Sequence, residues 1–134
     1  MNPPLRELTV ERFAEVLAAK GPGPAAGSTA AVSASLAAGL ATKVAKAAAD
    51  RETVTPDLAQ ELDALREHAL RLADDDVEAF AGFLEARRKP GGEPGAAEAI
   101  VQVPADVVAL AVRVAEIAAR LHADGRDHLA GDAV

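Results

Sequence analysis

The sequence predicts an all-α fold, a helical bundle with a central alanine-rich helix. Half of the 134 residues are hydrophobic, yet only three are aromatic and none is Trp, Tyr or Cys, so Ala, Leu and Val must build the core. Alanine is the best helix former and a poor strand former. The chain has no stretch of alternating β-branched residues bounded by turn signals. Its length suits one domain, and we expect residues 1–134 to form it.

The first helix is predicted from its two ends. Thr9 is a suitable N-cap, and a cation followed by a glycine, Lys20 and Gly21, is typical of a helix C-terminus. The Gly- and Pro-rich segment Gly21–Gly27 then reads as a loop.

The second helix is the predicted centre of the bundle. Ser28 is placed to cap it, and it runs to about Ala49. Nearly all of its other positions are small, so neighbouring helices can approach it closely from every side. Its larger apolar residues form one row, Val32, Leu36 and Leu40.

A long amphipathic third helix follows, with Thr55 as cap and Pro56 as first helical residue, and reaches about Ala86. Segment Arg87–Gly95, rich in Gly and Pro, is predicted to be a loop. The apolar stripe of the helix consists of Leu58, Leu62, Leu65, Ala69, Leu72, Ala79, Phe80 and Phe83.

The last third of the chain is predicted to hold a short helix, Ala96–Val101, and a longer one that starts at Pro104 and ends at Gly125. The inner face of the longer helix is expected to be Val107, Leu110, Ala111, Val114, Ile117, Ala118 and Leu121.

Charge and composition exclude several classes of function. A formal net charge of -7 disfavours non-specific binding to nucleic acid or to anionic membranes. The uncharged segment Gly21–Thr42 is mostly Ala, Gly, Ser and Thr, which indicates a protein-surrounded helix and no membrane span. The absence of cysteine excludes disulfides and thiolate zinc sites, and Met1–Thr9 lacks the apolar stretch of a secretory signal. We therefore expect a cytoplasmic protein.

Asp76 is the main candidate for chemistry because it continues the apolar spacing of the third helix one turn after Leu72. A carboxylate on a buried helix face is costly unless it is neutralised, paired or functional. The simpler interpretation is that the acidic run Asp74–Asp76 is a solvated surface, as we expect for Asp74 and Asp75. Asp76 is also free to reach a helix N-terminus or an arginine.

The loop Pro24–Ser28 is the second candidate, because the free amides and the dipole at a helix N-terminus suit an anion or a polar ligand edge. The alternative is an ordinary loop with a serine cap. His68, His122 and His128 are the only imidazoles, and none stands in a Glu-x-x-His arrangement, so no metal site is predicted.

Two segments together resemble the cyclodeaminase/methenyltetrahydrofolate cyclohydrolase family, which includes the C-terminal half of formiminotransferase-cyclodeaminase. The loop before the second helix, residues 21–31, is similar to its P-x-P-G-G-G-S-x-x-A loop, and Asp76–Phe80 resembles its D-x-x-A-F signature. Val103-Pro104 and Gly131-Asp132-Ala133 resemble two later landmarks, so the similarity runs in order from Phe13 to Asp132.

The resemblance implies an all-helical fold, usually a homodimer, that acts on one-carbon derivatives of tetrahydrofolate without a metal or other cofactor. The reaction would be that of a formiminotetrahydrofolate cyclodeaminase or a methenyltetrahydrofolate cyclohydrolase. Asp76 would be the catalytic carboxylate, and Phe80 would pack on the pterin ring or in the core. Pro24, Gly27 and Ser28 would hold a polar edge or an oxyanion. Arg87 and Arg88, with the neighbouring Lys89, would bind the glutamate tail or lie in a surface loop.

The chain also departs from the family pattern. Ala25 and Ala26 replace two glycines, and an arginine expected before Pro104 has no match. Relatives continue beyond the position of Val134, so we expect a domain that is incomplete at its C-terminus, as a fragment or a shortened member. The alternative function is a non-catalytic helical association module, a degenerate or truncated relative that dimerises through its alanine-rich surfaces.

Overall fold

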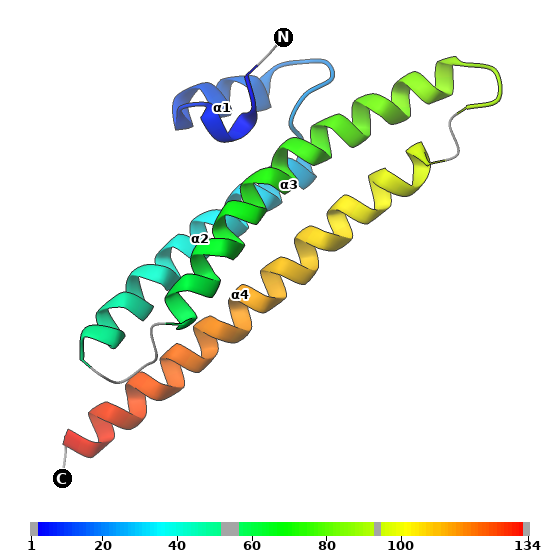
Figure 1. The fold of residues 1–134 in the computed structure, drawn as a ribbon. Helices are drawn as coiled ribbons and strands as arrows, with labels where there is room; N and C mark the ends of the chain where they lie inside the picture. Colours follow the sequence, from blue (N-terminus) through cyan, green and yellow to red (C-terminus); the bar gives the residue numbers. More distant parts are fainter. Residues whose placement is uncertain (1–2, 52–56, 93–94, 133–134) are drawn as a thin grey trace.

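The computed structural model describes residues 3–51, 57–92 and 95–132, and these residues form helices and no strand. A 3-10 turn η1 (Leu5–Glu7) precedes helix α1 (Val10–Ala18). Three long helices follow, α2 (Ala26–Asp50), α3 (Asp57–Arg88) and α4 (Ala96–Asp132). The long helices lie side by side, and α1 lies across the end where α2 begins (Figure 1). The predicted all-α fold is confirmed.

The core combines small side chains from α2 with larger ones from α3 and α4. Helix α2 buries only alanines and small polar residues, which lets α3 and α4 approach its backbone closely. The core residues are Ala31, Ala34, Ala38, Ala41 and Ala45 of α2, Leu58, Ala59, Leu62, Ala69, Leu72 and Ala73 of α3, and Val107, Leu110, Val114, Ile117 and Leu121 of α4.

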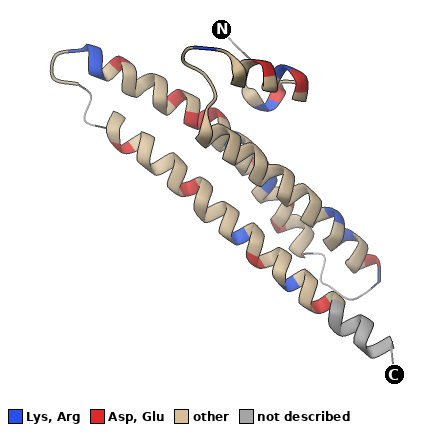
Figure 2. Cartoon of the chain, turned by 180° about the vertical axis from the view of Figure 1, so that it is seen from behind, with Lys and Arg blue, Asp and Glu red and all other residues tan. Residues whose placement is uncertain are grey.

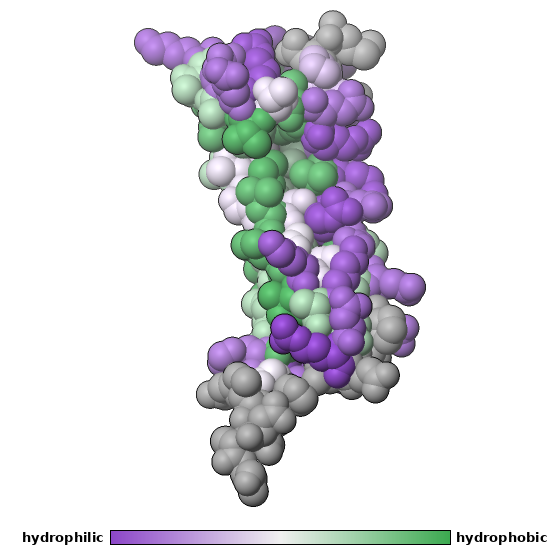
Figure 3. Space-filling model, turned by 90° about the vertical axis from the view of Figure 1, so that its left-hand side faces the viewer, coloured by the Kyte–Doolittle hydropathy of each residue, from purple (hydrophilic) through white to green (hydrophobic). Residues whose placement is uncertain are grey.

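The predicted row of larger residues on α2 does not face inward. Leu36 is 66% exposed and Leu40 is 69% exposed, and only Val32 packs partly against the core. Helices therefore do not surround α2 on all sides within one chain, because its alanine face alone packs on α3 and α4. An apolar stripe runs along the molecule on the side where α2 lies (Figure 3).

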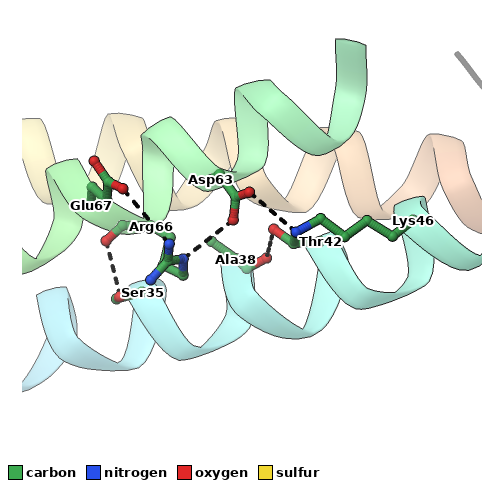
Figure 4. A network of polar contacts seen from close by, with 7 residues as sticks. All are labelled: Ser35, Ala38, Thr42, Lys46, Asp63, Arg66 and Glu67. Atoms are coloured by element: carbon green, nitrogen blue, oxygen red, sulfur yellow. Dashed lines mark hydrogen bonds and ion pairs between the residues drawn. The ribbon is translucent and has the colours of Figure 1, made fainter. Parts of the chain in front are cut away.

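A set of polar contacts fixes the register of α2 against α3 (Figure 4). The Ser35 hydroxyl donates to the main-chain oxygen of Arg66 at 3.0 Å, which requires the two helices to be close. Lys46 of α2 pairs with Asp63 of α3 at 3.4 Å, and Asp63 also pairs with Arg66. These side chains are well exposed, so the ion pairs orient the helices and add little stability.

Helix α4 is longer than the sequence predicts. The expected break between Val101 and Pro104 is absent, and the helix passes through Gly125 to Asp132. Pro104 removes one main-chain hydrogen bond but leaves the remaining bonds of the helix intact. Burial of Val107, Leu110, Val114, Ile117 and Leu121 on one face outweighs that cost, whereas Ala111 and Ala118 are exposed, contrary to prediction.

Helix α3 confirms the predicted stripe only in its first half. Leu58, Leu62, Ala69 and Leu72 are buried, whereas Phe80 is 46% exposed. The change follows from the arrangement in Figure 1, where α3 and α4 extend past the beginning of α2 and lose their third partner. The helix ends at Arg88, two residues later than predicted, and the expected cap at Thr55 and Pro56 lies outside the described residues.

The N-terminal segment is fastened to α3 by Asp74. The Leu5 amide donates to Asp74 Oδ1 at 2.5 Å, and the Arg6 guanidinium lies 3.4 Å from Oδ2. The Asp74 side chain is only 15% exposed, so the prediction of a solvated residue is wrong. Asp75 is exposed as predicted, and Thr9 caps α1 by accepting from the Arg12 amide at 3.1 Å. Helix α1 ends at Ala18, earlier than the predicted Lys20.

Candidate active site

Asp76 projects from the middle of α3 to the N-terminus of α2. Its Oδ2 atom accepts two hydrogen bonds from Ser28, one from the amide and one from the hydroxyl, both at 2.8 Å. Ser28 is completely buried and Asp76 is half-buried. The predicted inward position of Asp76 beside this loop is confirmed.

Ser28 does not cap α2, contrary to prediction. The helix begins at Ala26 with Ala25 as N-cap residue, and Ser28 lies within the first turn. Alanine has no side-chain acceptor for the free amides of a first turn. The acceptor is instead the carboxylate of Asp76, which comes from 48 positions away in the sequence. The Ser28 hydroxyl also accepts weakly from the Ala25 amide, at 3.4 Å.

Asp76 has a structural role through Oδ2, and its second carboxylate oxygen, Oδ1, takes no part in that role. Both donors bind Oδ2, and within the described part of the chain no donor is bonded to Oδ1. No described Lys or Arg forms an ion pair with Asp76, so its negative charge has no cationic partner among these residues. The dipole of α2 and the two donors stabilise that charge. A cationic ligand is therefore attracted to Oδ1.

A pocket of about 200 Å³ opens at this carboxylate. Residues of the loop and of the first turn of α2 form one wall, and residues of α3 and α4 form the other. The Ala26 and Gly27 amides have no acceptor among the described residues, so they remain available as donors. The pocket is lined by Gly23, Ala25, Ala26, Gly27, Asp76, Phe80 and Ile100.

A second pocket of about 270 Å³ lies further along α3 and α4. Phe83 lines it one turn after Phe80, and the first residues of α4 lie one turn before Ile100, so the two pockets adjoin. The Arg87 guanidinium stands 5.7 Å from the centre of the Phe83 ring. The lining consists of Phe83, Ala86, Arg87, Lys89, Gly92, Ala96 and Ala97.

Only some of the predicted binding residues line the two pockets. Gly27, Asp76 and Phe80 line the first pocket, and Arg87 lines the second. Pro24 is half-buried between two lining residues but does not line the pocket itself. Arg88 lines neither of these two pockets, whereas Lys89, which belongs to the same predicted basic cluster, lines the second. Basic residues at this end of α3 lie at the tip of the molecule (Figure 2).

Ile100 is a lining residue of the first pocket that sequence reasoning did not identify. It comes from α4, and only the pairing of α3 with α4 brings it opposite Asp76. Neither its apolar side chain nor its position in a predicted helix distinguishes Ile100 as a binding residue. Ile100 reaches this position because α4 continues as one helix through Pro104.

The remaining ionisable groups suggest no second centre. The Arg113 guanidinium donates to Glu61 at 2.6 Å and lowers the pKa of that exposed carboxyl, at a distance from both pockets along α3 and α4. No group of three His, Cys, Asp or Glu side chains suited to a metal occurs among the residues that the structure describes. His68 and His122 are exposed. None of the described helices has the length and apolar character that crossing a membrane requires.

Comparison with known proteins agrees with this geometry. A family model described as formiminotransferase-cyclodeaminase matches residues 9–134, which include the loop, Asp76 and both pockets. No curated protein and no solved structure gives a significant match.

Proposed function

Because the chain belongs to the formiminotransferase-cyclodeaminase family, we propose that it is a folate one-carbon enzyme, a formiminotetrahydrofolate cyclodeaminase or a methenyltetrahydrofolate cyclohydrolase. The observation that carries the proposal is that Asp76 lines the pocket beside the α2 N-terminus while only its Oδ2 atom is hydrogen-bonded to described residues. A carboxylate used only as a helix cap needs no adjoining pocket.

The two adjoining pockets support an elongated, partly aromatic ligand. Neither alone reaches the ~300–1,000 Å³ typical of small-molecule sites, so a folate would occupy both. Two of the three aromatic residues of the chain, Phe80 and Phe83, line them. In this proposal Phe80 packs on the pterin ring, and Arg87 and Lys89 bind the glutamate carboxylates.

In the cyclohydrolase reaction, Asp76 stabilises the cationic methenyl carbon and accepts a proton from the attacking water. The new carbon–oxygen bond gives a tetrahedral adduct, whose oxygen is bound by the free amides of Ala26 and Gly27. The bond from the carbon to N5 then breaks, N5 takes the proton held by Asp76, and the hydroxyl of the adduct releases its proton to solvent as the carbonyl of the 10-formyl product forms. These steps are proton transfers and bond cleavage, so they require no metal or redox cofactor.

In the cyclodeaminase reaction, N10 attacks the formimino carbon, and the nitrogen that leaves as ammonia must gain a proton. Asp76 would carry the proton from N10 to that nitrogen through Oδ1. Both reactions pass through a tetrahedral carbon at the same place, and the same residues serve them. The choice between them is made by assay.

The experiment follows the methenyl absorbance in both directions, with methenyl-tetrahydrofolate and with formimino-tetrahydrofolate as substrates. Wild type, Asp76→Asn and the matched control Asp75→Asn are compared, because Asp75 is the exposed neighbour. We expect Asp76→Asn to lose about 100-fold or more in kcat and the control to retain activity. If the wild-type protein does not change the methenyl absorbance faster than the spontaneous reaction with either substrate, the enzyme proposal is wrong.

The second candidate function is a non-catalytic association module, and the exposed apolar residues favour it. Leu36, Leu40 and Val44 lie one turn apart along the outer face of α2, and each is more than half exposed. Helix α4 adds exposed Val101, Val108 and Val112. Contiguous apolar surface of this kind marks an interface.

We propose that a second copy of the chain covers this surface, which is compatible with either function. A homodimer through α2 buries the same apolar row, Leu36, Leu40 and Val44, on both copies. Leu40→Glu is expected to shift the mass measured by light scattering from dimer to monomer, with the exposed α3 substitution Glu67→Gln as control. A wild-type monomer at micromolar concentration would contradict the proposal.

We propose that the protein is cytoplasmic, since a chain without cysteine is compatible with a reducing compartment. Fractionation of the native protein tests it.

A further inference from the structure

Gly27 has no room for a side chain, and the obstacle is Asp76. A Cβ atom built on Gly27 would lie 2.1 Å from Oδ1, 2.6 Å from Cγ and 2.8 Å from Oδ2 of that residue. All three distances are shorter than real Cβ contacts. The carboxylate therefore lies directly against the first turn of α2 at the one position where that turn has only hydrogens.

The backbone of Gly27 gives no other reason for glycine. Its φ is not positive, and it lies within the helical first turn, where alanine is the better residue. The chain accepts alanine at the two preceding positions, Ala25 and Ala26. The need for glycine at this position arises from Asp76 alone.

We propose that the missing side chain of Gly27 makes it a positioning residue for Asp76, a role separate from the contact that its amide makes with the substrate oxygen. The missing side chain lets the carboxylate bind both Ser28 donors with Oδ2, with Oδ1 close against Gly27, in a residue that lines the pocket. An added methyl group pushes the carboxylate away from Ser28, because the short Asp side chain cannot move aside and keep both bonds. The catalytic part of this inference rests on the proposed folate function, and the structural part does not.

The first experiment is a double-mutant cycle in thermal stability, which needs no activity. Gly27→Ala is expected to lower the Tm in the wild-type background and to leave it unchanged or raise it in the Asp76→Ala background, where the methyl group has space. Gly82→Ala is the matched control, since Gly82 is a helical glycine with nothing within 4 Å of its added Cβ. An equal loss of Tm in both backgrounds, or no loss in the wild-type background, would overturn the inference.

The second experiment separates positioning from direct contact with ligand. If Gly27 acts through Asp76, Gly27→Ala lowers kcat about 100-fold, close to Asp76→Asn, and changes KM little. Gly82→Ala keeps wild-type kinetics. If the methyl group instead blocks the ligand, KM rises while kcat and the Tm are unaffected, and the positioning role is wrong.

The two failures are distinguishable. Coupling between Gly27 and Asp76 in the Tm cycle, with no folate activity in the wild type, would support the positioning role and sink the proposed function. Folate activity without that coupling would support the function and sink the positioning role.

Discussion

Replacement of Asp76 by alanine tests the capping geometry at the centre of the site. The carboxylate accepts from the Ser28 amide and hydroxyl, and Ser28 is completely buried. Loss of a helix cap costs about 0.5–2 kcal/mol, and a buried donor left without an acceptor costs about 1–3 kcal/mol. The Ser28 hydroxyl can turn toward another acceptor, so only the amide stays unpaired. We therefore expect Asp76→Ala to lower the free energy of unfolding by about 2–3 kcal/mol.

The assay is urea unfolding followed by helical circular dichroism at a fixed protein concentration, so that association does not change the comparison. Asp76→Asn keeps one acceptor oxygen and loses the favourable charge at the helix N-terminus, so its expected cost is about 1 kcal/mol. Asp75→Ala, which changes an exposed neighbour, is expected to stay within about 0.5 kcal/mol of wild type. An Asp76→Ala protein with a free energy of unfolding equal to or above that of wild type would refute the capping role.

Three further predictions follow from named contacts. Ser28→Ala removes the hydroxyl bond to Asp76 and keeps the amide bond, so we expect a loss of about 1 kcal/mol in urea unfolding; no change would mean that the hydroxyl bond is not formed. Pro104→Ala restores a main-chain hydrogen bond inside α4 and is expected to raise the free energy of unfolding by about 1–3 kcal/mol; a decrease would show that the proline is needed where it lies. Arg113 lowers the pKa of Glu61 through their hydrogen bond, so the pair stabilises the folded state above the ordinary carboxyl pKa and loses this effect as the pH falls through the lowered value. Arg113→Gln is accordingly expected to cost a small amount of stability at pH 7 and progressively less as the pH falls through the lowered pKa of Glu61, and a pH-independent cost would contradict the linkage.

Periodicity predicts the parts of this fold that depend on local sequence. The spacing of Leu58, Leu62, Ala69 and Leu72 identifies the buried face of α3 and places Asp76 on it, and the structure confirms both. The core positions of α4, such as Val107 and Ile117, follow in the same way. These features are recoverable because one helix face must be apolar to be buried.

The features that sequence reasoning missed depend on contacts between distant segments. Ser28 has the residue type of an N-cap, yet α2 begins earlier because a carboxylate from α3 supplies the acceptor. Leu36 and Leu40 look like core residues, but alanine is what permits the closest packing of α2. Pro104 is a common first residue of a helix, and only packing against α2 and α3 makes the helix continue on both sides of it.

The most direct test of the account is a crystal structure of the protein with a stable reduced folate that carries a one-carbon group. We predict the one-carbon group within about 3 Å of Asp76 Oδ1, with the Ser28 bonds to Oδ2 kept and the ring system against Phe80. A folate bound elsewhere, with Asp76 out of contact, would contradict the central claim that this carboxylate both caps α2 and serves the reaction.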